Sequence, residues 1–315
     1  MWIRVAACFA AMLASIALAP LIGSSALSIG DVVSKDPVAA SIFWEVRVPR
    51  VLLSAIAGGG LAVAGLLFQA LLRDALATPY TLGISSGSSL GAVMAICFGW
   101  GIVWPFALGG GIAALFVVLG IAQKERRMSS FTLLLAGVTV NSMAMALILF
   151  LQSATTMGQS LTVVRWLMGS IEVVDSTALF LLAAIVIPLT ALLLWRAGDW
   201  NLLAVGEDWA AARGVSVERT QLIGYLAGSV LTASITTLTG PIGFVGLIVP
   251  HALRLWLGAD HRVLLPCSLF GGAAFLVVCD AIARVMMAPA DVPVGVVTAL
   301  AGGPFFIWLL RSRQP

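Results

Sequence analysis

About ten apolar runs, most of them close to twenty residues long, divide this chain and leave little of it for other structure. A helix needs about 20 mostly apolar residues to cross the hydrocarbon core of a bilayer. Only 10% of the 315 residues are charged and 61% are hydrophobic, whereas about a quarter of the residues in water-soluble domains are charged. We therefore expect an all-α polytopic membrane protein that forms a single transmembrane domain over residues 1–315. The expected spans are residues 3–22, 51–72, 82–99, 104–122, 132–151, 177–194, 222–238, 244–257, 264–287 and 293–310.

Charged residues at the ends of these runs indicate how the chain lies in the membrane. If the N-terminus is inside, most Lys and Arg residues face the cytoplasm, in agreement with the positive-inside rule. An even number of spans then returns the C-terminus to the same side. We expect a multi-pass membrane protein with both termini in the cytoplasm.

The first apolar run raises the question of processing. Arg4 followed by residues 5–22 resembles a secretory signal peptide, although the run is longer than the roughly 7–15 residues of a usual signal core. We interpret residues 1–22 as a retained first span, and cleavage is the alternative.

Residues 200–220 form a polar island in the second half of the chain, where Glu207, Asp208 and Arg213 alternate with apolar side chains. Gly206 and Gly214 divide it into pieces too short to be stable as isolated helices. Such amphipathic pieces persist where something covers their apolar sides. We expect the membrane domain to cover one side and a soluble partner the other. We also expect Gly206 to permit a sharp junction between the two pieces, where a β-branched residue would be strained. The alternative is an ordinary solvated loop.

Three of the arginines on the outer side of this topology have informative positions. Arg47 and Arg50 flank Pro49 just before the second span, and Arg284 lies four residues after Asp280. That spacing predicts an ion pair on one helix face. Arg47 and Arg50 either dock an acidic partner outside or extend along the membrane surface as snorkelling side chains.

Two other stretches have a readable local pattern. Glycine and proline interrupt the apolar residues 240–251, which predicts a kinked or broken helix. Residues 161–168 are short and amphipathic and predict a re-entrant or surface helix on the outer side.

Residue patterns that carry chemistry are missing from the sequence. The two histidines and four cysteines lack metal-ligand spacing, and no Ser-His-Asp or paired-carboxylate arrangement stands out. The glycine-rich stretch near residue 83 has no P-loop lysine, and no basic cluster is interleaved with aromatics. We expect no cofactor, no metal site, no catalysis and no nucleic-acid binding.

Several segments resemble the permease subunit of type II ATP-binding-cassette (ABC) importers for iron chelates and cobalamin, and the resemblance extends over almost the whole chain. The most specific ones lie in the C-terminal third. The resembling segments are R-V-P-R from Arg47, G-L-L-F-Q-A-L-L-R-D-A-L-A-T-P from Gly65, L-L-L-A-G-V from Leu133, W-L-M-G-S from Trp166, N-L-L-A-V-G-E from Asn201, G-P-I-G-F-V-G-L-I-V-P-H-A-L-R from Gly240, D-H-R-V-L-L-P from Asp260 and V-P-V-G-V-V-T-A-L-A-G-G-P-F-F-I-W-L-L from Val292.

The resemblance implies a location in the bacterial inner (plasma) membrane, and it implies partners and residue roles. In such permeases two copies, with ten spans each, enclose one pathway through the lipid membrane, sit on two cytoplasmic ATPase subunits and receive a metal chelate from a periplasmic binding protein. The implied roles are ATPase coupling for Asn201, Leu202, Leu203, Gly206, Glu207, Arg213 and Gly214; binding-protein docking for Arg47, Arg50 and Arg284; the cytoplasmic gate for Asp74, Leu76, Ser129, Ser130 and Phe131; and pathway lining for Asn141, Met145 and Gln152.

The stretch Arg73-Asp74-Ala75-Leu76-Ala77 departs from the family pattern, which has proline where this chain has Ala75 and asparagine at the place of Asp74. Two copies of Asp74 facing each other across a twofold axis would repel, unless Arg73 neutralises them. The alternative is that Asp74 caps the next turn and faces water.

Two other function classes remain as alternatives. An ion-coupled secondary transporter requires ionisable groups near the membrane midplane, and Asp280 alone comes close. An intramembrane enzyme requires a nucleophile and a base, and neither is visible. Among chelates, ferric siderophore is expected first, with haem or cobalamin next.

Overall fold

A computed structural model describes residues 2–23, 37–124, 127–128, 130–288 and 290–312. Among these residues, seven helices are long and apolar enough to cross a membrane. Three shorter apolar helices, Ile84–Cys97, Val245–Leu257 and Val294–Leu309, lie where the remaining predicted spans fall. The predicted all-α polytopic fold is confirmed, and each of the expected spans corresponds to a helix.

The described elements follow one another along the chain with short connections. One two-residue antiparallel strand pair, β1 with β2, joins the third and fourth long helices. The elements are α1 (Trp2–Leu18), η1 (Ala19–Leu21), α3 (Pro37–Ser41), η2 (Ile42–Arg47), α4 (Val48–Leu72), α5 (Ile84–Cys97), α6 (Trp104–Ala122), β1 (Gln123–Lys124), β2 (Arg127–Met128), α7 (Ser130–Ser153), α8 (Met157–Leu167), α9 (Ser176–Trp195), α10 (Ala197–Val205), α11 (Glu207–Ala212), α12 (Val217–Thr239), α13 (Val245–Leu257), α14 (His261–Met286) and α15 (Val294–Ser312).

Helix α4 is the core of the bundle. Almost all of its side chains from Val51 to Leu72 are buried, and it contacts α9, α12, α13 and α14. Glycine makes the closest approaches possible: a Cβ at Gly65 would lie 2.0 Å from the carbonyl oxygen of Gly246, and one at Gly58 would lie 2.3 Å from that of Gly272. Small residues at helix crossings allow backbones to pack closely in membrane proteins.

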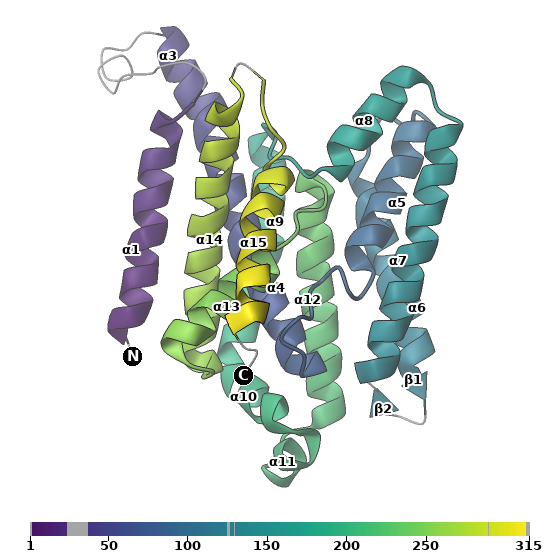
Figure 1. The fold of residues 1–315 in the computed structure, drawn as a ribbon, viewed down its shortest axis with the longest axis vertical. Helices are drawn as coiled ribbons and strands as arrows, with labels where there is room; N and C mark the ends of the chain where they lie inside the picture. The colour runs from purple at the N-terminus through teal and green to yellow at the C-terminus, as the bar shows by residue number, and fades with distance from the viewer. Residues whose placement is uncertain (1, 24–36, 125–126, 129, 289, 313–315) are drawn as a thin grey trace.

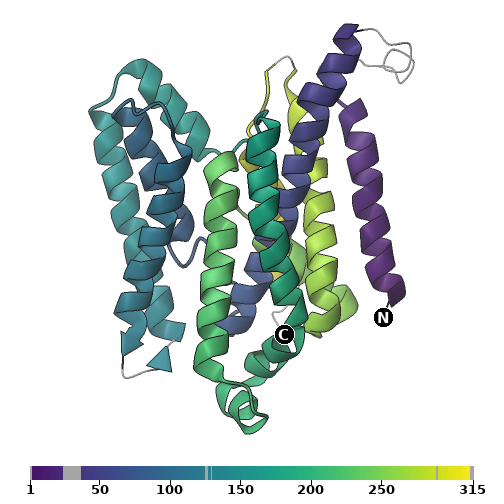
Figure 2. The same cartoon turned by 180° about the vertical axis from the view of Figure 1, so that it is seen from behind.

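The other helices surround α4 in two groups. Figures 1 and 2 show α5, α6 and α7 together on one side of the molecule and α1 at the opposite edge, with α4, α9, α12 and α14 between them. Helix α1 begins and α15 ends at the end of the bundle from which α10 and α11 project (Figure 1). We call this the inner end, following the predicted topology, and the opposite end the outer end.

The glycine- and proline-rich stretch between α12 and α13 breaks the helix, as its sequence predicts. Gly240 has a φ of 64° and ends α12, and Phe244 adopts the left-handed conformation, with a φ of 68°, before α13 begins. The break packs against the outer region, since a Cβ at Gly240 would lie 2.3 Å from the carbonyl oxygen of Trp166. Its backbone polar groups are therefore covered by protein, where such irregular backbone is tolerated in a membrane.

The short amphipathic stretch on the outer side forms α8. Thr156 begins this helix with a capping box, in which its hydroxyl accepts from the backbone N–H of Gln159 and the Gln159 side chain accepts from the backbone N–H of Thr156. The Gln159 amide also donates to the carbonyl oxygens of Ile96 and Cys97 at the outer end of α5. These bonds hold α8 across the end of its neighbours (Figure 1).

Candidate functional site

Residues 197–212 form the two short helices that the sequence predicts. Helix α10 is anchored by Trp200, which is fully buried and donates from its indole N–H to the carbonyl oxygen of Leu193, 2.9 Å away. On the outward side, Val205 is 70% exposed and Trp209 is 60% exposed, with the Arg213 guanidinium 5.7 Å from the Trp209 ring centroid. One side of this segment is thus covered by the membrane domain, and the other presents a surface of apolar and charged side chains.

Asn201 ties α10 to the start of α14. Its Nδ2 donates to Asp260 Oδ1 at 2.7 Å, and its Oδ1 accepts the backbone N–H of His261 at 2.8 Å. The hydrogen bond from Asn201, together with the backbone N–H of Arg262, lowers the pKa of Asp260. Leu203 is buried beside this contact and Leu202 is half-buried, so the amide and the apolar side chains fix α10 together.

The backbone conformation of Gly206, at the junction of the two short helices, differs from the one that we expected. Gly206 lies between α10 and α11, but its φ of 162° is extended backbone that any residue adopts, and a Cβ there would meet nothing within 4 Å. The prediction that a β-branched residue would be strained at Gly206 is therefore wrong. Gly214, at the end of the segment, has a φ of 83° in the left-handed region, where residues with a side chain are disfavoured.

Arg73 connects the inner end of α4 with α11 and α12. It follows α4 in the left-handed conformation, with a φ of 52°, and its Nη2 lies 2.7 Å from Glu207 Oε1. The same carboxylate oxygen accepts a hydrogen bond from Gln221 Nε2 at 3.3 Å. Within this chain, Arg73 therefore neutralises Glu207 and leaves Asp74 without the partner that the sequence considered for it.

The predicted gate residues lie on two segments that pack against each other. Asp74 Oδ1 accepts the backbone N–H of Leu76 at 2.9 Å, which makes Asp74 a cap of its own turn. Leu76 and Phe131 are both exposed at the inner end, Phe131 by 74%. The rest of this loop reaches α7, where a Cβ at Gly137 would lie 2.1 Å from the carbonyl oxygen of Thr81.

Of the two serines of the predicted gate, the structure describes Ser130. Ser130 begins α7, and its buried hydroxyl has no hydrogen-bond partner among the described residues. Ser129 lies outside the described residues.

Helix α7 carries the predicted pathway residues. Asn141 and Met145 are exposed on one face, four residues apart, and the Asn141 side chain accepts a hydrogen bond from the hydroxyl of Ser86 in α5. Gln152, near the outer end of α7, donates to the Ser160 hydroxyl of α8 at 3.2 Å. The same helix exposes many large apolar side chains, among them Val138. This face is left uncovered by the single chain.

The three outer arginines gather at the outer ends of α4 and α14. Asp280, which is fully buried, accepts a hydrogen bond from Arg50 Nε at 3.0 Å, and its other carboxylate oxygen lies 3.2 Å from Arg284 Nε. The ion pair predicted from the spacing of Asp280 and Arg284 is therefore confirmed. Arg50 Nη1 also lies 2.7 Å from the half-exposed carboxylate of Asp291. The guanidinium groups of Arg50 and Arg284 are therefore both paired with carboxylates of this chain.

The N-terminal helix ends on the same cluster. Arg284 Nη2 donates to the carbonyl oxygen of Ala19 at 3.1 Å, and Arg47 Nη1 donates to that of Pro20 at 2.9 Å. Cations are favourable at the carbonyl end of a helix, so Arg47 and Arg284 fasten the end of α1 and η1 to the bundle.

Beside this cluster lies a cavity of about 550 Å³ that reaches Arg50 and Asp291 from the outer side. Its described lining residues are Arg50, Thr162, Arg165, Trp166, Ser170, Ile171, Glu172, Val173, Asp291, Val292 and Pro293.

A model of the FecCD transport family matches residues 11–312. The chain belongs to the FecCD transport family. It is 40% identical over 277 residues to a cobalamin import system permease protein of Halobacterium salinarum, covering 87% of this chain and 74% of that protein. It is 38% identical over 287 residues to a hemin transport system permease protein of Yersinia pestis, covering 87% and 84%.

A solved structure agrees with this assignment. The inward-facing conformation of a metal-chelate type ABC transporter is 31% identical and has a TM-score of 0.88, with 98% of each chain covered. This FecCD permease therefore has the expected type II ABC importer fold, and its family role is transport rather than catalysis. Among its described residues, no three His, Cys, Asp or Glu side chains gather as metal ligands.

The sequence did not reveal the long-range partners in this FecCD permease. Arg50 and Asp280 lie 230 positions apart, and Arg73 and Glu207 lie 134 apart. No periodicity relates such positions. Opposite charges at the ends of separate spans on the same side were the available signal, and they left several pairings possible.

Proposed function

We propose that this chain is the permease subunit of a binding-protein-dependent ABC importer, which moves an intact metal chelate into the cytoplasm while a separate subunit hydrolyses ATP. Relatives named for hemin and for cobalamin support a chelate as the substrate class. Ferric siderophore is our first candidate, and haem and cobalamin follow. A chelate carried whole requires no metal ligands from the permease.

The observation that carries this proposal is the exposed surface of α10 and α11. Val205 and Trp209 are large, exposed apolar side chains, and the helices that carry them, α10 and α11, project from the inner end of the bundle (Figure 1). Exposed apolar patches of this kind mark protein interfaces. The buried Trp200 and the Asn201 bonds hold the segment rigidly, so a push on Trp209 by an ATPase subunit is passed to α9 and α14.

A second copy of the chain is the partner proposed for the open face of α7. Asn141 and Met145 lie on that face, and Gln152 lies near its outer end. In a twofold dimer the same face of each copy meets its counterpart. Two such faces would enclose a pathway lined by amide and thioether groups, which suits a bulky amphipathic chelate.

The outer cluster is the proposed docking region for a periplasmic binding protein. Arg47, Arg50 and Arg284 lie within one cluster, although each already bonds to this chain. A carboxylate of the binding protein would approach Arg50 through the adjoining cavity, where Asp291 holds one of its nitrogens.

Reconstitution tests the proposal. The chain is co-expressed with candidate ATPase subunits, purified, and placed in vesicles with a binding protein and a radiolabelled ferric siderophore, haem or cobalamin. We expect the ATPase to co-purify and uptake to require ATP. Uptake driven by an ion gradient without ATP would instead establish the alternative, an ion-coupled secondary transporter.

A further inference from the structure

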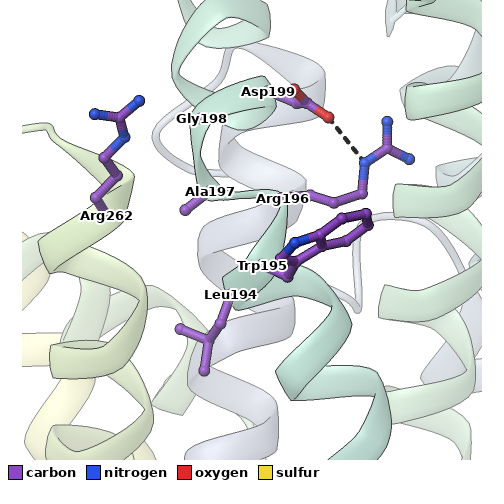
Figure 3. A pocket seen from close by; sticks show the side chains of 7 residues that line it. All are labelled: Leu194, Trp195, Arg196, Ala197, Gly198, Asp199 and Arg262. Carbon is purple, nitrogen blue, oxygen red and sulfur yellow. Dashed lines mark hydrogen bonds and ion pairs between the residues drawn. The ribbon is translucent and has the colours of Figure 1, made fainter.

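A cavity of about 580 Å³ lies where α9 ends and α10 begins, at the inner end of the bundle. The cavity is separate from the exposed surface of α10 and α11, which we call the coupling surface, and from the predicted gate. Its described lining residues are Leu194, Trp195, Arg196, Ala197, Gly198, Asp199 and Arg262 (Figure 3).

The cavity carries a net positive charge. Asp199 is its one described carboxylate, and Arg196 Nε neutralises it at a distance of 2.8 Å. Arg262 lies on the opposite wall, across Gly198 from that pair (Figure 3), and a Cβ at Gly198 would lie 3.5 Å from Arg262 Nη2. No described carboxylate lies within ion-pair distance of the Arg262 guanidinium. Arg262 is therefore the charge that a ligand in the cavity would meet.

The surroundings of the cavity are those of a membrane interface. Trp195, at its rim, is 82% exposed, and tryptophan is enriched at the level of the lipid headgroups. Along α9 above it, Phe180, Leu181 and Ile187 are also exposed, and Figure 2 shows α9 on the outside of the bundle with no helix in front of it. An apolar helix face thus leads directly down to a basic cavity.

We propose that this cavity binds the phosphate headgroup of an anionic phospholipid of the cytoplasmic leaflet, whose acyl chains lie along α9. Basic pockets between spans on the cytoplasmic side recognise such headgroups, and a guanidinium can hold a phosphate through two parallel hydrogen bonds. The assignment of the leaflet rests on the orientation in the proposed function. An ATPase subunit is the competing occupant, and the exposed apolar face of α9 favours lipid because a soluble partner would leave that face unexplained.

The site has a mechanical consequence. Arg196 donates to the Thr220 hydroxyl at 2.9 Å, and Asn201 connects the same helix to α14. A phosphate held between Arg262 and the first turn of α10 would join α9, α10 and α14 at the membrane surface. Anionic lipid would then stiffen the base of the coupling segment.

Lipid binding by the purified full-length chain tests this proposal. Phosphatidylglycerol or phosphatidylcholine is titrated into the protein in detergent, and the first bound lipid is counted by native mass spectrometry. We expect phosphatidylglycerol to bind the parent at least about tenfold more tightly than phosphatidylcholine, because phosphatidylcholine carries the same phosphate together with a choline cation, which cancels the net negative charge that attracts Arg262. Arg262→Gln should abolish most of this preference, and Gly198→Met, which fills the cavity while keeping every charge, should do the same.

Arg4→Gln is the matched control, because Arg4 is an exposed arginine of the inner end in α1 and its loss should change the preference less than about twofold. An unchanged preference in Arg262→Gln would overturn the proposal. So would equal competition by inorganic phosphate, which would make free anion the ligand, or complete displacement of lipid by an added ATPase subunit. Because the measurement needs neither ATP nor chelate, its failure leaves the proposed transport function standing, and a failure of transport leaves the lipid result standing.

Discussion

Arg73 at the inner end of α4 lies 2.7 Å from Glu207 at the start of α11. The most buried helix of the bundle therefore bonds directly to the second of the two short helices that project from it. Any displacement of α11 by a partner acts on the loop that follows α4 and carries Asp74 and Leu76. The bond is a direct contact between the coupling segment and the loop that carries two of the predicted gate residues.

Reversing this pair should disturb coupling more than folding. Both side chains are more than one-third exposed, so Arg73→Glu should cost only about 0–1 kcal/mol of stability. We expect uptake per ATP hydrolysed in reconstituted vesicles to fall about fivefold, the ratio that corresponds to roughly 1 kcal/mol. The double variant Arg73→Glu, Glu207→Arg should recover most of the loss. A double variant as impaired as the single one would show that the pair does not couple the two regions.

Asp74 should act through its cap rather than through its charge. Its Oδ1 accepts the backbone N–H of Leu76, and the side-chain oxygen of asparagine can make the same bond. Asp74→Asn should therefore keep thermal stability and basal ATP hydrolysis within error of the parent. Asp74→Ala should lose about 1 kcal/mol, measured by thermal unfolding. A change in basal ATP hydrolysis in Asp74→Asn alone would instead favour repulsion between two copies of Asp74.

Gly214, rather than Gly206, should be the sensitive glycine of the coupling segment. With a φ of 83° at Gly214, a β-branched side chain costs roughly 1–3 kcal/mol in the backbone alone. We expect Gly214→Val to lower uptake and ATPase co-purification several-fold. The matched control is Gly206→Val, where the backbone is extended and the space is open, and it should assemble like the parent. Equal damage in both variants would mean that the partner occupies the space at Gly206.

The two glycines illustrate what the sequence could and could not predict. Apolar runs long enough to span a bilayer predicted every span, because length and hydropathy are sufficient for that inference. The division of residues 200–220 into two helices was also readable, since Gly206 and Gly214 interrupt the pattern. The sequence did not show which of the two positions needed glycine, because φ depends on how the short helices are held. Trp200 and Asn201 are bonded to Leu193 and Asp260, which lie outside the segment.

The cluster of Arg50, Asp280 and Arg284 at the outer end was also only partly predictable from the sequence. The spacing of Asp280 and Arg284 was sufficient to predict their ion pair, because residues four apart share a helix face. The bond between Arg50 and Asp280 joins two helices distant in sequence, so it follows from packing that no local pattern encodes. The same is true of the carbonyl oxygens of Ala19 and Pro20, which any arginine near the end of α1 could have bound.

Asp280 should matter greatly for stability. It is fully buried and neutralises Arg50 and Arg284, and removing one partner of a buried ion pair costs about 3–5 kcal/mol. Asp280→Asn should therefore lower the unfolding temperature in detergent by several degrees. Asp291→Asn is the matched control, since its carboxylate is 46% exposed and its loss should cost no more than about 1 kcal/mol. Equal losses would mean that the buried cluster carries no special share of the stability.

Asp291 should compete with the binding protein for Arg50. Reversing the charge of Arg50 would place a carboxylate near Asp280, and reversing that of Arg47 would remove its bond to the Pro20 carbonyl oxygen. Both changes would disturb the fold, so those variants cannot isolate docking. Asp291→Asn keeps the size of the side chain and removes the negative charge that neutralises Arg50 at the outer cavity. We expect the association of binding protein with the permease to strengthen about fivefold at low salt, because a rim charge acts mainly through steering and a close charge pair. The gain should shrink toward high salt as screening increases.

The control for this last prediction is Glu172→Gln, which removes a negative charge from the same cavity without removing a bond to Arg50. If docking uses the Arg50 guanidinium, Asp291→Asn should strengthen association clearly more than Glu172→Gln does, measured by surface-immobilised permease across a salt series. Equal gains would reduce the effect to the general charge of the outer surface. A weaker association in Asp291→Asn would mean that Asp291 itself faces a basic group of the binding protein, and Arg50 would then serve only to hold Asp280 and Asp291 in place.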